Sequence, residues 1–246
     1  MILLLAGTSE ARRLAHALHD AGVPALASLV GATREPEALA LPTRHGGWGG
    51  DAGFEAFLDA TPVLVVIDAT HPFAASVTAR TLRICAARGV PLLRLERPGW
   101  TPGPGDRWTF VADEREAARR IPPDATVFLA TGRQSLPAWA GLRARAVHLR
   151  VIDPPDAPFP FPGGFVVARP PFDAAAEVGT FRRLGVTHVV VKDSGGAEGR
   201  AKLDAARDLG LPVLVLRRPP APPGLETVEA VEEALDWAVA HSFPPP

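Results

Sequence analysis

The sequence contains no tyrosine, a single cysteine and only two lysines, Lys192 and Lys202. Without tyrosine the chain cannot be a short-chain dehydrogenase of the usual kind, because those enzymes need a Tyr-x-x-x-Lys motif. Because Cys85 is alone, the chain can form neither an internal disulfide nor a cluster of cysteine metal ligands. We therefore expect a protein of a reducing compartment, the cytoplasm, and we predict no metal site.

Long apolar runs and a strong net charge are also absent. No run reaches the roughly eighteen residues that a membrane span needs, and a formal net charge of -1 gives a nucleic-acid partner no electrostatic support. The apolar start at residues 1–6 lacks a basic flank, so it predicts a buried strand rather than a signal segment. We expect a soluble globular protein that binds neither membranes nor nucleic acid, with its oligomeric state left open.

What the sequence does have is a regular alternation of short apolar runs with amphipathic stretches of Ala, Leu and Arg. This pattern is typical of βα units on a parallel sheet. It predicts an α/β fold of two Rossmann-like parallel-sheet domains with an interdomain cleft. The predicted strands are residues 2–6, 25–30, 63–68, 91–95, 126–130, 146–152, 165–168, 187–191 and 212–216. The predicted helices are residues 9–21, 51–60, 73–88, 114–120, 173–184, 199–209 and 228–240.

A stretch rich in proline and glycine, residues 96–106, can hold neither a helix nor a central strand. We interpret it as a domain linker. The predicted domains are therefore residues 1–97 and residues 98–246.

Open parallel sheets bind ligands at the carboxyl ends of their strands. Small and polar residues follow the first predicted strand: Gly7, Thr8, Ser9, Glu10 and Arg12. The glycine permits a tight turn, and the N-terminus of the next helix offers N–H groups to a phosphate. A serine cap beside a solvated arginine would give the same pattern.

Arg34 follows the second predicted strand, where an NAD-binding enzyme usually has an acidic residue. An arginine there favours a 2′-phosphate and hence NADP, unless it is an ordinary exposed side chain. The next candidate is a loop at residues 46–50 with four glycines in five positions, Gly46 and Gly47 on one side of Trp48. Such a loop is costly to order and usually lets the backbone approach a ligand, although a flexible turn is the alternative.

Three more strand ends carry polar residues. Thr70 and His71 follow a buried strand, and His71 could donate a proton, contact a cofactor or cap the next helix. In the second half, two strand ends combine a cation, hydroxyls and glycine, which are the ingredients of a phosphate or carboxylate site. Those residues are Thr131, Gly132 and Arg133 after one strand, and Lys192, Ser194, Gly195 and Gly196 after another.

Taken in order, these stretches resemble the precorrin-6A reductase family, including its cobalt-precorrin counterpart, over nearly the whole chain. The matching motifs are Leu-Leu-Ala-Gly-Thr-Ser-Glu-Ala-Arg at 4–12, the 46–50 loop, Asp-Ala-Thr-His-Pro-Phe-Ala at 68–74, Leu-Arg-Leu-Glu-Arg-Pro at 93–98, Thr-Gly-Arg at 131–133 and Lys-Asp-Ser-Gly-Gly at 192–196. Each motif is modestly specific, but their order is hard to obtain by chance. Two positions depart from the family pattern: Pro170 stands where glycine is expected, and Asp193 where asparagine is commoner.

The resemblance implies hydride transfer from NADPH to a ring-contracted tetrapyrrole on the pathway to cobalamin (vitamin B12), with or without cobalt in the substrate. It implies NADPH at the strand ends of the 1–97 domain and the macrocycle in the cleft, with the 98–246 domain contributing. The cofactor-binding residues so implied are Gly7, Thr8, Ser9, Glu10, Arg12, Arg34, Gly46, Gly47 and Thr70. The substrate-binding residues are Trp48, Arg97, Thr131, Gly132, Arg133, Lys192, Ser194, Gly195 and Gly196, with Trp100 and Arg169 as further candidates.

His71 is the expected catalytic residue, as a proton donor, although water could fill that role. Any of the arginines could instead be a solvated surface side chain. Two other classes of function stay open on the sequence: another NADP-dependent oxidoreductase of small molecules, and a non-catalytic two-lobed ligand-binding protein.

Overall fold

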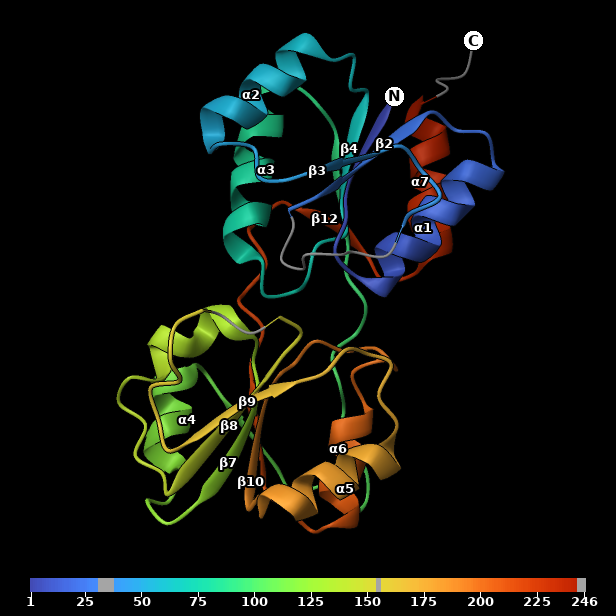
Figure 1. The fold of residues 1–246 in the computed structure, drawn as a ribbon. Helices are drawn as coiled ribbons and strands as arrows, with labels where there is room; N and C mark the ends of the chain where they lie inside the picture. The colour runs from blue at the N-terminus through green and yellow to red at the C-terminus, as the bar shows by residue number, and fades with distance from the viewer. Residues whose placement is uncertain (31–37, 154–155, 243–246) are drawn as a thin grey trace. The chain divides into compact units, whose positions relative to one another are not determined.

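The computed structural model describes residues 1–30, 38–153 and 156–242. The chain forms two compact units: unit 1 contains residues 1–98 and the described residues from 219 onward, and unit 2 contains residues 99–218 (Figure 1). Each unit is built on a six-stranded sheet whose paired strands run parallel. The predicted fold class, two Rossmann-like parallel-sheet domains, is confirmed.

The sheet of unit 1 has the strand order β3-β2-β1-β4-β5-β12. Its elements are β1 (Ile2–Leu5), α1 (Ser9–Asp20), β2 (Ala25–Leu29), β3 (Thr43–His45), α2 (Asp51–Ala60), β4 (Val65–Asp68), α3 (Ala75–Arg88), β5 (Leu92–Leu95), β12 (Glu226–Val228) and α7 (Val231–Ser242). Counted in chain order within the unit, this is the 3-2-1-4-5-6 arrangement of dinucleotide-binding folds.

Helices cover both faces of this sheet, with α1 and α7 on one side and α2 and α3 on the other (Figure 1). The fully buried strand β1 shows why: Ile2 and Leu4 pack into the first layer, whereas Leu3 packs into the second. A strand that is buried on both faces reads as a continuous apolar run. In α1, residues at i, i+3, i+4 and i+7 are buried, the spacing of one helix face: Ala11, Leu14, Ala15 and Leu18.

The sheet of unit 2 has the strand order β9-β8-β7-β10-β11-β6. Its elements are β6 (Trp108–Val111), α4 (Glu114–Arg120), β7 (Thr126–Ala130), the 3-10 helix η1 (Arg133–Trp139), β8 (Ala146–Val151), β9 (Gly163–Val167), α5 (Ala174–Leu184), β10 (His188–Lys192), α6 (Ala201–Asp208) and β11 (Val213–Leu216). Helices α5 and α6 lie on one face of the sheet and α4 on the other (Figure 1). The two sheets share one spatial arrangement of strands, but the corresponding edge strand comes last in the chain order of unit 1 (β12) and first in that of unit 2 (β6).

The two units exchange their sixth strands. The chain leaves unit 1 after β5 and forms β6 at the edge of the unit 2 sheet, and it leaves unit 2 after β11 and forms β12 at the edge of the unit 1 sheet. There Thr227 of β12 pairs with Arg94 of β5. The prediction of one domain at residues 98–246 is therefore wrong for its C-terminal part, because a three-residue strand carries no signal for the sheet that it joins.

The strands that the sequence did not predict, β3, β6 and β12, all lie at sheet edges, where short and partly polar strands suffice. The 3-10 helix η1 was also not predicted, since Pro137 lies inside it. Across the described ranges, no helix combines the length and the apolar character that a membrane crossing requires.

Candidate functional site

In unit 1 the strand order reverses between β1 and β4, which are neighbours with Leu5 opposite Asp68. The turns that follow these strands lie next to each other, and the Thr8 hydroxyl donates to the carbonyl of Ala69 at 3.0 Å. The same hydroxyl caps α1 by accepting the N–H of Ala11 at 3.1 Å. In open α/β sheets this reversal point is where ligands bind, so the structure brings the predicted residues after β1 and β4 together.

Gly7 forms the first of these turns with a φ of 157°. A Cβ at this position would lie 3.9 Å from the backbone N of His71 and 3.9 Å from Cα of Thr70, which is ordinary contact. Space inside the protein therefore does not exclude a side chain. A side chain there would be strained in the backbone and would lie beside the second turn.

The N-terminus of α1 already holds one carboxylate. Glu10 is 6% exposed and forms ion pairs with Arg97 and, at 3.2 Å, with Arg13. Burial would raise the pKa of the Glu10 carboxyl, but its own backbone N–H and the charge and hydrogen bond of Arg97 outweigh burial and lower that pKa. An anionic ligand at this helix therefore meets a compensated pair rather than a bare negative charge.

His71 lies in the segment between β4 and α3, residues 69–74. Its Nδ1 accepts a hydrogen bond from the backbone N–H of Phe73 at 3.2 Å. A ring nitrogen that accepts carries no proton, so the neutral imidazole has its proton on Nε2. The ring can donate from Nε2, whereas full protonation would cost the hydrogen bond from Phe73.

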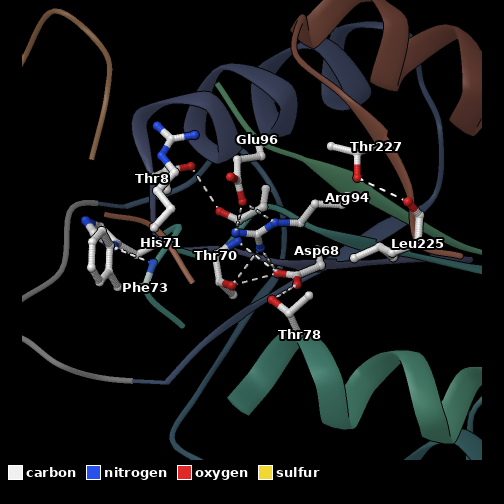
Figure 2. A network of polar contacts seen from close by, with 12 residues as sticks. Thr8, Asp68, Thr70, His71, Phe73, Thr78, Arg94, Glu96, Leu225 and Thr227 are labelled. Atoms are coloured by element: carbon white, nitrogen blue, oxygen red, sulfur yellow. Dashed lines mark hydrogen bonds and ion pairs between the residues drawn. The ribbon is translucent and has the colours of Figure 1, made fainter. Parts of the chain in front are cut away.

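Behind these turns lies a buried polar network that the sequence did not reveal (Figure 2). Asp68 is 0% exposed and Arg94 is 3% exposed, and they form an ion pair at 2.8 Å. Arg94 also donates to the Thr70 hydroxyl at 3.0 Å and to the Glu96 carboxylate at 2.8 Å. The sequence does contain a sign of this network: Arg94 interrupts one apolar strand, and Asp68 ends another.

The glycine loop at residues 46–50 follows β3 in the same unit. The guanidinium of Arg44 holds it by donating to the carbonyls of Gly46 at 2.9 Å and Gly47 at 3.2 Å. Arg44 also lies 3.7 Å from the ring centre of Trp48, which in turn packs on Phe54. Trp48 is therefore buried beneath Arg44, and its ring is not a free platform for a flat ligand.

In unit 2 the strand order reverses between β7 and β10, where Ala130 lies opposite Val191. The two predicted loops of this half thus follow neighbouring strands. In the first, the hydroxyls of Thr131 and Ser135 are 2.7 Å apart, and Ser135 also donates to the Gly132 carbonyl at 2.8 Å. Arg133 is exposed, and among the described residues it has no ion-pair partner.

The second loop runs from Lys192 to Gly196. Burial lowers the pKa of the Lys192 ammonium, and the negative charge of Glu114 opposes that shift. Trp100 anchors the loop: its backbone N–H donates to the Asp193 carboxylate at 2.9 Å, and its indole donates to the Gly196 carbonyl at 2.7 Å. Trp100 is 7% exposed, so it supports the loop from inside rather than offering a surface to a ligand.

Residues 1–239 match the family described as "Precorrin-6x reductase CbiJ/CobK". The chain belongs to this precorrin-6x reductase family. A precorrin-6A reductase from Rhodococcus erythropolis is 46% identical over 238 residues, 96% of each chain. A precorrin-6A reductase from Rhodobacter capsulatus is 44% identical over 246 residues, 99% of this chain and 98% of the relative. A solved structure described as "CobK precorrin-6A reductase" is similar with a TM-score of 0.91 and 44% identity, covering 98% of this chain and 96% of that chain.

Membership of the precorrin-6x reductase family confirms the resemblance seen in the sequence and favours an enzyme over the binding-protein alternative. The predicted site residues fall into separate groups. Gly7, Thr8, Ser9, Glu10, Thr70 and His71 gather at the reversal point of unit 1, and Thr131, Gly132, Arg133, Lys192, Ser194, Gly195 and Gly196 follow the two strands at that of unit 2. Gly46, Gly47 and Trp48 form a loop after β3.

Three predicted arginines need separate mention. Arg97, which is expected to bind substrate, forms an ion pair with Glu10 in unit 1. Arg34 lies outside the described residues. Arg169, a further substrate candidate, pairs with Asp153 at 2.9 Å.

Proposed function

We propose that this chain is an NADPH-dependent precorrin-6A reductase, in which unit 1 binds NADPH and unit 2 contributes to binding the tetrapyrrole. One observation carries the proposal: in a chain of this family, the turns after β1 and β4 lie side by side at the reversal point of a 3-2-1-4-5-6 sheet. Bound NADPH supplies the hydride. The protein has to bind, orient and shield the reactants.

The residues of unit 1 fit a dinucleotide. Gly7 leaves the first turn without a side chain, and the N-terminus of α1 follows it directly. Because Arg97 neutralises the Glu10 carboxylate, that carboxylate would repel a pyrophosphate at the N-terminus of α1 only weakly. We therefore assign Gly7, Thr8 and Ser9 to the phosphate region and Thr70 to the neighbouring side of the cofactor.

The residues of unit 2 fit a macrocycle that carries acetate and propionate carboxylates. A guanidinium and an ammonium, Arg133 and Lys192, stand at the ends of neighbouring strands. The glycines at 195 and 196 both have positive φ, 65° and 73°, so this turn depends on them. Arginine can bind a carboxylate through two parallel N–H···O hydrogen bonds, a bidentate geometry that lysine cannot form. We assign Arg133 to a carboxylate of the substrate.

Reduction also needs a proton. We assign it to His71, whose Nε2 is the protonated nitrogen when Phe73 occupies Nδ1. In this assignment the ring first takes up a second proton from solvent, at the cost of the hydrogen bond from Phe73, then donates its Nε2 proton to the reduced macrocycle as an imidazolium and returns to the neutral imidazole.

The first test is cofactor binding and reduction. We expect fluorescence titration to give a far lower Kd for NADPH than for NADH, because Arg34 follows β2 where an NAD-binding enzyme usually has an acidic residue. The Arg34→Glu variant should weaken NADPH and leave NADH nearly unchanged. Equal Kd values for both cofactors in the wild type would reject NADPH, and failure to reduce precorrin-6A with either cofactor would reject the activity.

A further inference from the structure

Asp68 and Arg94 are the most deeply buried acidic and basic side chains of unit 1, and neither has a role in the function just proposed. Asp68 ends β4 and Arg94 lies within β5, and the two are register partners in the sheet. A buried ion pair is rarely more stable than well-packed apolar residues of the same volume. Its position directly behind the turn that carries His71 therefore suggests a role other than stability.

The contacts show what the pair holds. Both the backbone N–H and the hydroxyl of Thr70 donate to one carboxylate oxygen of Asp68, at 3.0 Å and 2.7 Å. The Thr70 hydroxyl also accepts from Arg94 at 3.0 Å. Three hydrogen bonds with two charged residues, two donated by Thr70 and one accepted by it, thus fix Thr70, a 6% exposed residue that immediately precedes His71 (Figure 2).

The remaining contacts fix the pair itself. Glu96 accepts two hydrogen bonds from Arg94, at 3.0 Å and 2.8 Å, and so sets the plane of its guanidinium. On the other side of the turn, the carbonyl of Ala69 accepts from Thr8, the cap of α1. The segment from Ala69 to His71 is therefore held from β5 on one side and from the first ligand-binding turn on the other.

We propose that Asp68 and Arg94 are positioning residues that hold Thr70 and aim the His71 ring at the reacting atoms. The proposal rests on the function proposed above for the unit 1 reversal point. It explains why the motifs at residues 68–74 and 93–98 occur together: the first carries the histidine, and the second carries the arginine that orients it. Neither Asp68 nor Arg94 needs to touch substrate or cofactor.

The chain offers a matched control. Thr78 of α3 donates to the other oxygen of Asp68 at 2.6 Å, and like Thr70 it is buried. It approaches the same carboxylate from the helix rather than from the His71 turn (Figure 2). A purely structural network would respond alike to loss of either hydroxyl, whereas a positioning network should respond to Thr70 only.

The experiment compares Asp68→Asn, Arg94→Lys, Thr70→Val and Thr78→Val with wild type. It measures NADPH Kd, the single-turnover rate of reduction, the Tm, and the imidazole NMR signals of His71, assigned with His71→Ala. Misplacement of a catalytic group by about 1 Å can cost roughly 100-fold, so we expect the first three variants to lose between about tenfold and about 100-fold in rate. Their His71 signals should move, and Thr78→Val should keep both the rate and the signals.

The conservative variant Thr70→Ser keeps the hydroxyl and should restore both the rate and the His71 signals lost in Thr70→Val. It also decides the matter if Asp68→Asn or Arg94→Lys fails to fold, because it leaves the ion pair intact. Unchanged His71 signals in folded Thr70→Val, or an equal loss of rate in Thr78→Val, would overturn the proposal. A wild-type protein that neither binds NADPH nor reduces precorrin-6A would reject the proposed function instead, and the NMR comparison would still report on the positioning of His71.

Discussion

The sheets of the two units share one spatial arrangement of strands, but the units differ in the chemistry at the point where strand order reverses. In unit 1 this region holds buried charges that compensate one another, namely Asp68 with Arg94 and Glu10 with Arg97. In unit 2 it holds hydroxyls and positive-φ glycines, together with Arg133, which is exposed and has no ion-pair partner in the described part of the chain. The fold supplies a place for a ligand in both units, and the side chains decide which ligand fits.

The difference matters because a charged side chain that is paired within the protein is held in place, whereas an unpaired one can bind a charged group of a ligand. A buried, paired carboxylate cannot bind another cation without losing its partner, so unit 1 is built to hold its turns in place. An exposed arginine without a protein partner keeps its donors for a carboxylate from outside. The predictions below test this contrast, beginning with the largest expected effect.

The largest effect should follow from His71→Ala in unit 1. General acid catalysis contributes about 10²–10⁴-fold, so turnover should fall at least about tenfold while NADPH Kd changes little. The ring also accepts from the N–H of Phe73, so its loss should lower the Tm as loss of a cap would. His71→Asn can still accept that N–H, and it should recover Tm but not rate. A folded, fully active His71→Ala protein would remove the catalytic assignment.

A smaller effect is expected from Gly7→Val, which places a branched side chain in the first turn of unit 1. The φ of 157° strains any side chain at this position, and the added side chain would lie beside the turn that carries Thr70 and His71. We expect NADPH Kd to rise by about tenfold or more, equivalent to about 1.4 kcal/mol. Binding is measured by NADPH fluorescence on protein shown to be folded by circular dichroism. Unchanged affinity would place the pyrophosphate elsewhere.

Arg133→Ala tests whether the exposed arginine of unit 2 binds a carboxylate of the substrate. A hydrogen bond to a charged group contributes about 1.5–3 kcal/mol, so KM for the macrocycle should rise by roughly tenfold to 100-fold. NADPH Kd should not change, because the variant leaves unit 1 intact. The matched control is Arg182→Ala, an exposed arginine in the last turn of α5, which lies toward the opposite end of the strands. Equal KM values for both variants would show that Arg133 is only a surface charge.

The smallest effect concerns alkaline pH, where the two units should respond in opposite directions. In unit 2, burial lowers the pKa of Lys202 from 10.5 to about 8. The folded protein therefore releases this proton before the unfolded chain does, and the free energy of unfolding should rise between these pH values. In unit 1, burial raises the pKa of Cys85 from 9.0 to about 12. The folded protein keeps that proton longer, so its contribution falls with pH over that range.

The chain suits this measurement because it has no tyrosine and only two lysines. Chemical unfolding at several pH values above 8 should show that Lys202→Met loses a positive slope, and Cys85→Ala a negative slope, of at most about 1.4 kcal/mol per pH unit. If the two substitutions changed the pH dependence of the unfolding free energy in the same direction, the pKa shift of Lys202 or of Cys85 would be wrong.

Much of the fold could be predicted because it depends on local pattern. The doubly buried strands read as apolar runs, and α2 and α4 have the predicted bounds. The sequence Gly89-Val90-Pro91 is a typical helix stop, and Gly89 ends α3 in a left-handed conformation. The candidate turns were predictable for the same reason, since each directly follows a strand and carries its small and polar residues in sequence.

What only the tertiary structure decided is which distant residues meet. The sequence determined two sets of βα units and the turns after them, because hydrophobic period and turn chemistry act over a few residues. It did not determine that β6 and β12 change units, nor that Arg94 would lie opposite Asp68. Those outcomes depend on pairing between segments far apart in the chain. The place of a three-residue edge strand, or of one buried arginine, is set by the distant neighbour that satisfies its hydrogen bonds.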